Sequence, residues 1–171
     1  DGDFRNWNIS QGNGIEGIDE SKCIYSESYD AQSNSPLTPD NYIVSDGLYT
    51  ITENSTLSFY AKPLDTWSNY YLEHYGVAIS YDGTNFITVW EHTVSSTELD
   101  WVHKTVDLSD YAGRNVYIAL RHFDCSNRYA ICIDNIELTS GNRSAKSSTI
   151  ENLTVPAGVY YLVASATEEF T

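Results

Sequence analysis

Several residue types that mark particular protein classes are rare or missing in this chain. Of its 171 residues none is methionine, four are proline and three are cysteine. Three cysteines cannot all pair with one another, and the spacing of Cys23, Cys125 and Cys132 is not that of a zinc finger. We therefore predict three free thiols and no disulfide framework. No run of 18 apolar residues occurs, so we expect no membrane span.

Positive charge is scarce as well. Nine lysines and arginines stand against 24 aspartates and glutamates, which gives a formal net charge of −15. Such a surface repels phosphate groups, so we expect no nucleic acid partner. Acidic, oxygen-rich loops suit calcium, although the same composition also serves solubility alone. Because the chain begins with Asp1 and not with methionine, we interpret it as an internal piece of a longer protein.

What the chain does contain is typical of β-structure. It has 14 tyrosines, 4 tryptophans and 5 phenylalanines, which are enriched in strands. Its apolar residues alternate with polar ones and do not recur with the 3.6-residue period of a helix. In the stretch NVYIALRHF, for example, Val116, Ile118 and Leu120 share one face. The pattern predicts eight main strands, at Cys23–Glu27, Tyr42–Val44, Thr56–Ala61, Glu73–Tyr81, Phe86–His92, Trp101–Leu108, Val116–His122 and Ala130–Leu138.

The spacing of these segments indicates the architecture. Short strands without intervening helices favour an antiparallel sandwich or barrel. Asp82-Gly83 is suited to the positive φ values of a tight hairpin turn. Polar loops such as 30–39 and 65–70 favour long crossovers. We predict an all-β antiparallel β-sandwich with jelly-roll topology.

Composition changes near residue 140. Residues 141–149 are small and polar, which is typical of a linker. Pro156-Ala157-Gly158 predicts a turn, and Val159–Ala166 a strand after it. We therefore divide the chain into a domain at 1–140, a linker at 141–149 and a β-hairpin at 150–171. The hairpin either begins a second module or packs on the first.

Three stretches together resemble a known family. They are DGDFRNW (Asp1–Trp7), TPDNYIVS (Thr38–Ser45) and YIALRHFDCSNRYAICIDNIEL (Tyr117–Leu138), and they resemble the cleaved adhesin domain of gingipain-type proteases, haemagglutinins and surface proteins of Bacteroidetes, a relative of the MAM-like jelly rolls. The resemblance implies a jelly roll with structural calcium and no catalysis. It further implies a secreted or cell-surface module that binds host proteins, haem proteins or glycans. We expect the module to be monomeric. Members usually carry a strand with a Phe-Glu pair before the Asp-Gly-Asp loop, and this sequence does not contain it.

Candidate calcium ligands lie at both ends of the resembling region. Asp1 and Asp3 flank a glycine, and Asp134 and Asn135 lie in the last main strand, which neighbours the first in a jelly roll. The alternative is that Asp134 only hydrogen-bonds to backbone at a strand end. A second oxygen cluster is expected at Asp124 and Asn127, with a plain turn as the alternative.

An aromatic cluster is the candidate ligand-binding surface. The stretch DTWSNYYLEHY places Trp67, Tyr70, Tyr71 and Tyr75 close together beside polar residues. Exposed aromatic rings anchor protein partners or sugars. The alternative is that these rings cover an open face of the sandwich.

No catalytic pattern stands out. The chain has no Gly-x-Ser-x-Gly elbow, and nothing further supports Glu73 and Glu91 as a glycosidase pair. None of the four histidines shows zinc spacing or neighbours a cysteine in a ligand pattern, and we expect His122 to be a hydrogen-bonded structural residue. The sequence thus predicts a binding module and not an enzyme. The alternative is an ancillary domain of a protease or glycoside hydrolase.

Overall fold

The computed structural model describes residues 3–10, 12, 14–139 and 160–162. All eight predicted strands are present, with ends within two residues of the prediction. Short strands and two single turns of 3-10 helix, η1 and η2, supplement them. The elements are β1 (Asn8–Ile9), η1 (Ile18–Glu20), β2 (Ile24–Glu27), β3 (Tyr29–Asp30), β4 (Ser35–Pro36), β5 (Asp40–Ser45), β6 (Tyr49–Thr50), β7 (Thr56–Pro63), β8 (His74–Ser80), β9 (Ile87–Thr93), β10 (Val102–Asp107), η2 (Ser109–Tyr111), β11 (Asn115–Phe123), β12 (Ala130–Thr139) and β13 (Tyr160–Leu162).

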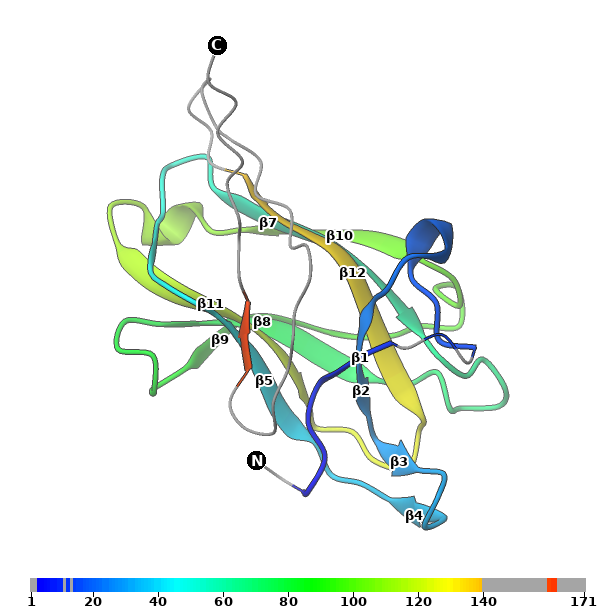
Figure 1. Ribbon diagram of the computed structural model, residues 1–171. Helices are drawn as coiled ribbons and strands as arrows, with labels where there is room; N and C mark the ends of the chain where they lie inside the picture. The colour runs from blue at the N-terminus through cyan, green and yellow to red at the C-terminus, as the bar shows by residue number, and fades with distance from the viewer. Residues whose placement is uncertain (1–2, 11, 13, 140–159, 163–171) are drawn as a thin grey trace.

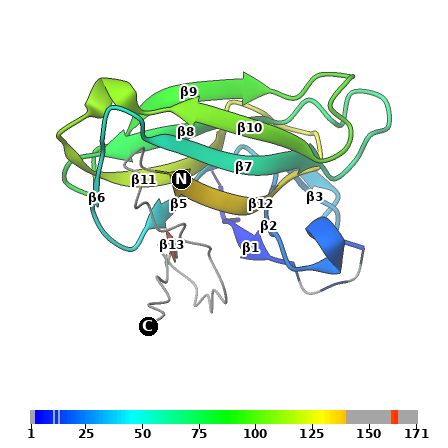
Figure 2. The same ribbon diagram turned by 90° about the horizontal axis from the view of Figure 1, so that it is seen from above.

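Two sheets form the body of the protein. One has the strand order β1-β2-β12-β7-β10, and the other has the order β13-β5-β11-β8-β9, with β6 paired to β11. Every pairing is antiparallel except that of β13 with β5. Figure 1 shows the strands of both sheets, and Figure 2 shows β5 and β13 toward one side and the edge strands β9 and β10 toward the other. The predicted all-β antiparallel sandwich is confirmed, while the jelly-roll connection remains a prediction.

Strict alternation along the long strands produces the core. In β7, Leu57, Phe59 and Ala61 are buried and the residues between them are half-exposed. Ile118 and Leu120 of β11 belong to the same apolar cluster from the opposite sheet. Complete burial of a side chain such as Phe59 contributes about 1.5–3 kcal/mol, so this interlayer cluster is the main stabilising element.

Strand β12 is covered on both faces over its first half. Ile131, Cys132 and Ile133 are all fully buried. Its register with β7 then shifts between Asp134 and Glu137, and Asn135 takes a positive φ of 50°. A bulge of this kind bends the strand and turns its side chains toward new partners. The structure has Cys23, Cys125 and Cys132 as free thiols.

The β8–β9 hairpin differs from its prediction in detail. Gly83 has a φ of 76°, but Asp82 does not take a positive φ. Asp82 instead accepts hydrogen bonds on its Oδ1 from the backbone N–H groups of Thr84 and Asn85, at 2.9 and 2.8 Å. These bonds, with others from Ser80 and Asn85, lower the pKa of Asp82. The loop is therefore a longer turn built on an aspartate side chain.

The predicted linker at 141–149 lies outside the described residues. Of the predicted hairpin at 150–171, residues 160–162 are described. They form β13, which pairs in parallel with β5 and sets Tyr160 opposite Ile43. The division of the chain into domains remains a prediction. Among the described residues, no helix has the length and apolar character needed to cross a membrane.

Candidate functional site

A cluster of three titratable side chains lies where β11 ends and β8 begins. His122 comes two residues after Leu120 on β11, so alternation turns its side chain into the sandwich, where it is completely buried. Glu73 lies immediately before β8, the strand that pairs with β11, and is also completely buried. Asp124, with a φ of 50°, turns the chain after β11 and returns the partly buried Cys125 toward His122.

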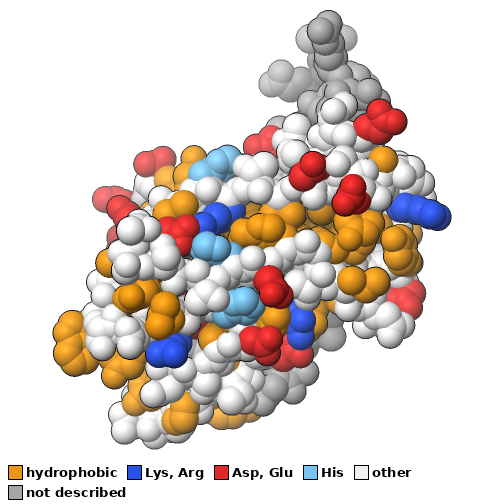
Figure 3. Space-filling model, turned by 180° about the vertical axis from the view of Figure 1, so that it is seen from behind, with side chains coloured by type: hydrophobic (Ala, Val, Ile, Leu, Met, Phe, Trp, Pro, Cys, Tyr) orange, Lys and Arg blue, Asp and Glu red, His pale blue; other side chains and the backbone are white. Residues whose placement is uncertain are grey.

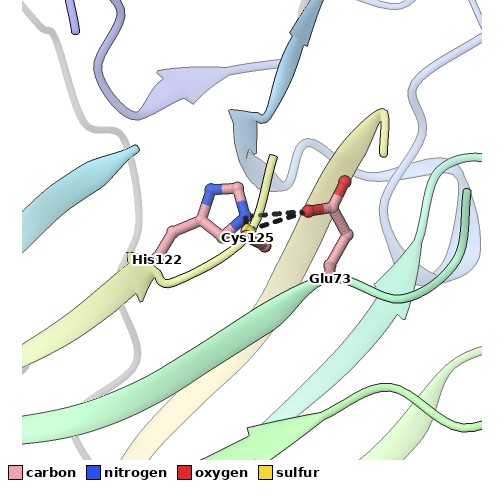
Figure 4. A group of neighbouring side chains, drawn as sticks. All are labelled: Glu73, His122 and Cys125. Atoms are coloured by element: carbon pink, nitrogen blue, oxygen red, sulfur yellow. Dashed lines mark hydrogen bonds and ion pairs between the residues drawn. The ribbon is translucent and has the colours of Figure 1, made fainter. Parts of the chain in front are cut away.

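The three functional atoms point at one another (Figure 4). His122 Nε2 lies 3.0 Å from Glu73 Oε2, and the Cys125 Sγ lies 3.1 Å from that nitrogen and 3.3 Å from that oxygen. Within the residues that the structure describes, this is the group of three histidine, cysteine or acidic side chains able to meet on one metal ion. We call Glu73, His122 and Cys125 the buried cluster.

Further hydrogen bonds fix the far side of each ligand. Glu73 Oε1 accepts from the Ser28 hydroxyl at 2.9 Å and from the Tyr129 backbone N–H at 2.7 Å. His122 Nδ1 lies 2.8 Å from the Ser26 hydroxyl oxygen. These partners come from β2, the residue after it and the loop before β12, so the buried cluster ties the two sheets together.

The chemistry of the buried cluster does not favour nucleophilic catalysis. Burial first, and the nearby Glu73 carboxylate second, raise the pKa of the Cys125 thiol. A thiol of raised pKa is a poor nucleophile because little thiolate is present at neutral pH. In addition, the carboxylate bonds to the same histidine nitrogen that faces the sulfur, whereas an orienting acid in a triad bonds to the other nitrogen.

The expectation about histidines and cysteines was therefore half right. His122 is a buried, hydrogen-bonded residue, as predicted. We expected no histidine to neighbour a cysteine in a ligand pattern, and this was wrong. Cys125 follows His122 by three residues, and its Sγ lies 3.1 Å from His122 Nε2. The available signals were the spacing in HFDC and an acidic residue, Glu73, at the start of an apolar strand. The same burial removes Glu73 from a glycosidase pair with Glu91, whose side chain is 60% exposed on β9.

The predicted calcium ligands occupy separate places. Asp1 lies outside the described residues. Asp3 accepts from the backbone N–H of Arg5 at 2.7 Å and from that of Thr38 at 2.9 Å. Asp134 accepts on Oδ2 from the Ile18 backbone N–H at 2.8 Å and from the Ser21 hydroxyl at 3.2 Å. The two carboxylates thus bind different segments of backbone.

The remaining candidate ligands lie in turns. Asn135 is exposed within the β12 bulge. Asp124 and Asn127 are exposed and have φ values of 50° and 56°, and the Asn127 backbone N–H donates to the Ser28 carbonyl at 3.0 Å. These positions match the turn interpretation of the 124–127 loop and leave calcium binding a prediction.

Of the predicted aromatic cluster, one part is exposed. The Trp67 side chain is 73% exposed and its ring centroid lies 5.8 Å from that of Tyr70. Tyr71 is half-buried against the core cluster. Tyr75 is a correction, because it is 1% exposed and cannot present its ring to a ligand. It alternates with Val77 and Ile79 on the inner face of β8, a pattern that was visible in the sequence.

The β9–β10 edge carries a second group of charged residues. Figure 3 shows histidine, acidic and basic side chains gathered with apolar ones on this side of the molecule. Glu98 Oε2 lies 2.7 Å from His92 Nε2, and Glu98 Oε1 forms an ion pair with Lys104. Burial opposes ionisation of Glu98, but the hydrogen bonds from Lys104 and His92 outweigh it and lower its pKa to about 2. The group joins β9 to β10 and so closes this edge of the sandwich.

Comparison with known proteins identifies a family and relatives to which the chain is similar. A family model described as Cleaved Adhesin Domain matches residues 1–138. Haemagglutinin A of Porphyromonas gingivalis strain W83 is 33% identical over 148 residues, which cover 74% of this chain and 7% of that protein. Gingipain R1 of Porphyromonas gingivalis strain ATCC 33277 is 33% identical over 171 residues, which cover 90% of this chain and 10% of that protein. The chain thus spans a tenth or less of the length of these two relatives.

A solved structure agrees with the sequence match. The K1 cleaved adhesin domain of Lys-gingipain from Porphyromonas gingivalis W83 superimposes with a TM-score of 0.70 and 29% identity, covering 82% of this chain and 87% of that one. The resemblance seen in the three stretches of sequence is thereby confirmed over the sandwich. The chain belongs to the cleaved adhesin domain family.

Proposed function

We propose that this chain is a non-catalytic adhesion module of a larger secreted or cell-surface protein, and that it binds a host protein or glycan through Trp67 and Tyr70. The observation that carries the proposal is the exposed Trp67 ring, which lies beside the half-buried ring of Tyr70, on a member of the cleaved adhesin domain family. Similarity to haemagglutinin A and to gingipain R1 supports a role at cell surfaces.

Hydrogen bonds fix the conformation of the 65–70 loop, which carries Trp67 and Tyr70. The Trp67 backbone N–H donates to Asp65 Oδ1 at 2.7 Å, and the Tyr70 N–H donates to the Trp67 carbonyl at 3.1 Å. From the 124–129 loop, Arg128 donates to the Asn69 carbonyl at 3.3 Å. A large aromatic side chain held in one place loses little conformational entropy on binding, which is why tryptophan and tyrosine dominate binding hot spots.

Absence of catalysis is part of this proposal. The side chains best suited to acid–base chemistry lie in the buried cluster, but Glu73 and His122 have no exposed surface that a substrate could reach. The exposed Trp67 ring has no titratable group, and the nearby Asp65 carboxylate accepts from the Trp67 backbone N–H at 2.7 Å. Both features favour binding over turnover.

Calcium stabilisation is the second part of the proposal. The net charge of −15 favours a divalent cation. Asp134 already joins the bulge of β12 to the 17–21 loop, and Asp3 joins the N-terminal segment to Thr38. Calcium at either carboxylate would strengthen the same connections. We expect a chelator to lower the melting temperature, by an amount equivalent to about 2.7 kcal/mol if calcium is present at a hundred times its Kd. An unchanged melting curve would remove calcium from the proposal and leave adhesion in place.

Binding is tested with whole cells as the probe. The chain is attached to fluorescent beads, and its binding to washed erythrocytes is measured by flow cytometry, a choice that follows from the haemagglutinin relative. We expect Trp67→Ala and Tyr70→Ala to reduce binding. Tyr81→Ala is the matched control, because Tyr81 is 53% exposed at the β8–β9 hairpin. Equal binding by Trp67→Ala and wild type would contradict the assignment of this loop.

A second role is compatible with the same surface. The gingipain relative carries its matching segment within a protein about ten times longer. As the second candidate we infer an ancillary domain of a protease or glycoside hydrolase. In that case the aromatic pair brings a separate catalytic domain to its substrate. A full-length sequence that encodes such a catalytic domain would favour this role, and one that encodes only binding modules would oppose it.

A further inference from the structure

The buried cluster has the geometry of a metal site. Three donor atoms of different kinds, an imidazole nitrogen, a carboxylate oxygen and a sulfur, lie 3.0–3.3 Å from one another. In a tetrahedral zinc site with bonds of 2.0–2.3 Å, neighbouring ligand atoms are about 3.3–3.6 Å apart. An outward shift of a few tenths of an ångström in each side chain would therefore admit an ion. We propose that Glu73, His122 and Cys125 bind Zn²⁺, with a fourth position left for water.

The outer hydrogen bonds orient the ligands correctly for this purpose. Ser26 contacts His122 at Nδ1, which leaves Nε2 to face the ion. Ser28 and the Tyr129 backbone N–H occupy Glu73 Oε1, which leaves Oε2 to face it. Partners on the far atoms of histidine and carboxylate ligands are a regular feature of zinc sites, where they fix both tautomer and orientation.

Charge balance also favours a divalent cation. Binding forms a sulfur–metal bond at Cys125 and breaks its S–H bond, and the proton leaves to solvent. The thiolate and the Glu73 carboxylate together carry two negative charges, which Zn²⁺ neutralises in a region where uncompensated charge is costly. His122 contributes a neutral nitrogen.

The donor set selects the kind of metal. Calcium and magnesium take oxygen ligands almost exclusively, so they do not fit a site built from sulfur and nitrogen. Thiolate and imidazole ligands together suit zinc, and cobalt occupies the same geometry. Because Cys125 is partly exposed whereas Glu73 and His122 are buried, an ion would reach the site from the 124–129 loop.

Cobalt provides the direct test. The reduced protein is titrated with Co²⁺, and we expect a thiolate-to-cobalt charge-transfer band together with the visible bands of a tetrahedral ion, at one equivalent per chain. Added Zn²⁺ should abolish both signals and raise the melting temperature, while added Ca²⁺ should leave both cobalt signals in place. The absence of a charge-transfer band in the wild-type protein would overturn the proposal and leave the buried cluster as a hydrogen-bonded network only.

Matched variants locate the ion. Cys125→Ser should abolish the charge-transfer band, whereas Cys132→Ser, which removes a buried thiol elsewhere, should retain it. Ser28→Ala, which removes the hydroxyl partner of Glu73 and the acceptor of the Arg128 backbone N–H, should weaken Zn²⁺ binding about tenfold. A band that persists in Cys125→Ser and disappears in Cys132→Ser would place the metal elsewhere and overturn the proposal. Circular dichroism of each variant confirms that it is folded before titration.

Discussion

The buried cluster and the Trp67–Tyr70 loop are neighbours with opposite properties. Glu73 and His122 are polar and fully buried, and both carboxylate oxygens and both ring nitrogens have hydrogen-bond partners. Trp67, in contrast, is apolar and 73% exposed. Only five residues separate Trp67 from Glu73. A substitution in the buried cluster should lower the free energy of unfolding, because the groups left without a partner have no access to water. Truncation of Trp67 should hardly change it, because the exposed ring contributes little to the fold.

Disturbing the buried cluster should have the largest effect on stability. Glu73→Ala leaves the Tyr129 N–H, the Ser28 hydroxyl and the His122 ring without their acceptor inside the protein. We expect a loss of about 3–5 kcal/mol in the free energy of unfolding. Urea denaturation of wild type, Glu73→Ala and the shape-preserving Glu73→Gln measures it. A loss below about 1 kcal/mol for Glu73→Ala would show that the network is not an important stabilising element.

The carboxylate at the β12 bulge should rank next. Asp134→Ala removes the acceptor of the Ile18 N–H and of the Ser21 hydroxyl, and we expect a loss of about 1–2 kcal/mol. Asp124→Ala is the control, because that residue lies exposed in a turn and should change stability by less than about 1 kcal/mol. Thermal melts of both variants with and without calcium also reveal whether Asp134 is a calcium ligand. Identical losses for the two variants would argue against a special role for the bulge.

The edge group at Glu98 should make a smaller, pH-dependent contribution. Its pKa falls from an ordinary value of 4.5 to about 2 in the folded protein. A lowered carboxylate pKa stabilises the folded state above the unfolded pKa, and this contribution is lost as pH falls from about 4.5 toward 2. Because the group is partly solvated, we expect Glu98→Gln to cost less than about 1 kcal/mol at pH 7.

The pH profile separates this effect from simple packing. The difference in unfolding free energy between wild type and Glu98→Gln should shrink as the pH is lowered below 4.5. A difference that stays constant from pH 7 to pH 3 would mean that ionisation of Glu98 does not stabilise the β9–β10 edge.

Truncation of the exposed ring should have the smallest effect on the fold. Trp67→Ala removes a side chain that contacts Tyr70 and otherwise faces solvent, and we expect a change within about 0.5 kcal/mol. Differential scanning calorimetry compares it with wild type. A loss above about 2 kcal/mol would mean that the ring belongs to the core, as the alternative interpretation of the aromatic cluster held.

The strands were predictable because their determinants are local. Alternation places Val116, Ile118 and Leu120 on one face without knowledge of any partner strand, and the prediction matches β11 to within a residue. The two-residue strands β1, β3, β4 and β6 were not predicted, since a segment that short has no period. The bulge at Asp134 also escaped, because it depends on the register between β12 and β7.

The buried cluster was not predictable from spacing alone. Glu73 lies 49 residues before His122, and only the β8–β11 pairing brings the two side chains together. The aromatic cluster was predictable in part. Trp67 has polar neighbours and is exposed, whereas Tyr75 alternates with apolar residues and is buried. A residue's place within a strand thus decided its exposure more strongly than its residue type.

The central claim is that binding depends on the Trp67–Tyr70 loop, whereas the buried cluster contributes to stability and not to binding. One paired measurement tests it. Erythrocyte binding and melting temperature are determined together for Trp67→Ala and Glu73→Gln, at a temperature where both variants are folded. The account predicts that Trp67→Ala retains the wild-type melting temperature and loses at least about tenfold in binding, since an aromatic hot spot contributes about 2 kcal/mol. It predicts that Glu73→Gln melts lower and binds like wild type. Wild-type binding by Trp67→Ala together with lost binding by folded Glu73→Gln would contradict it.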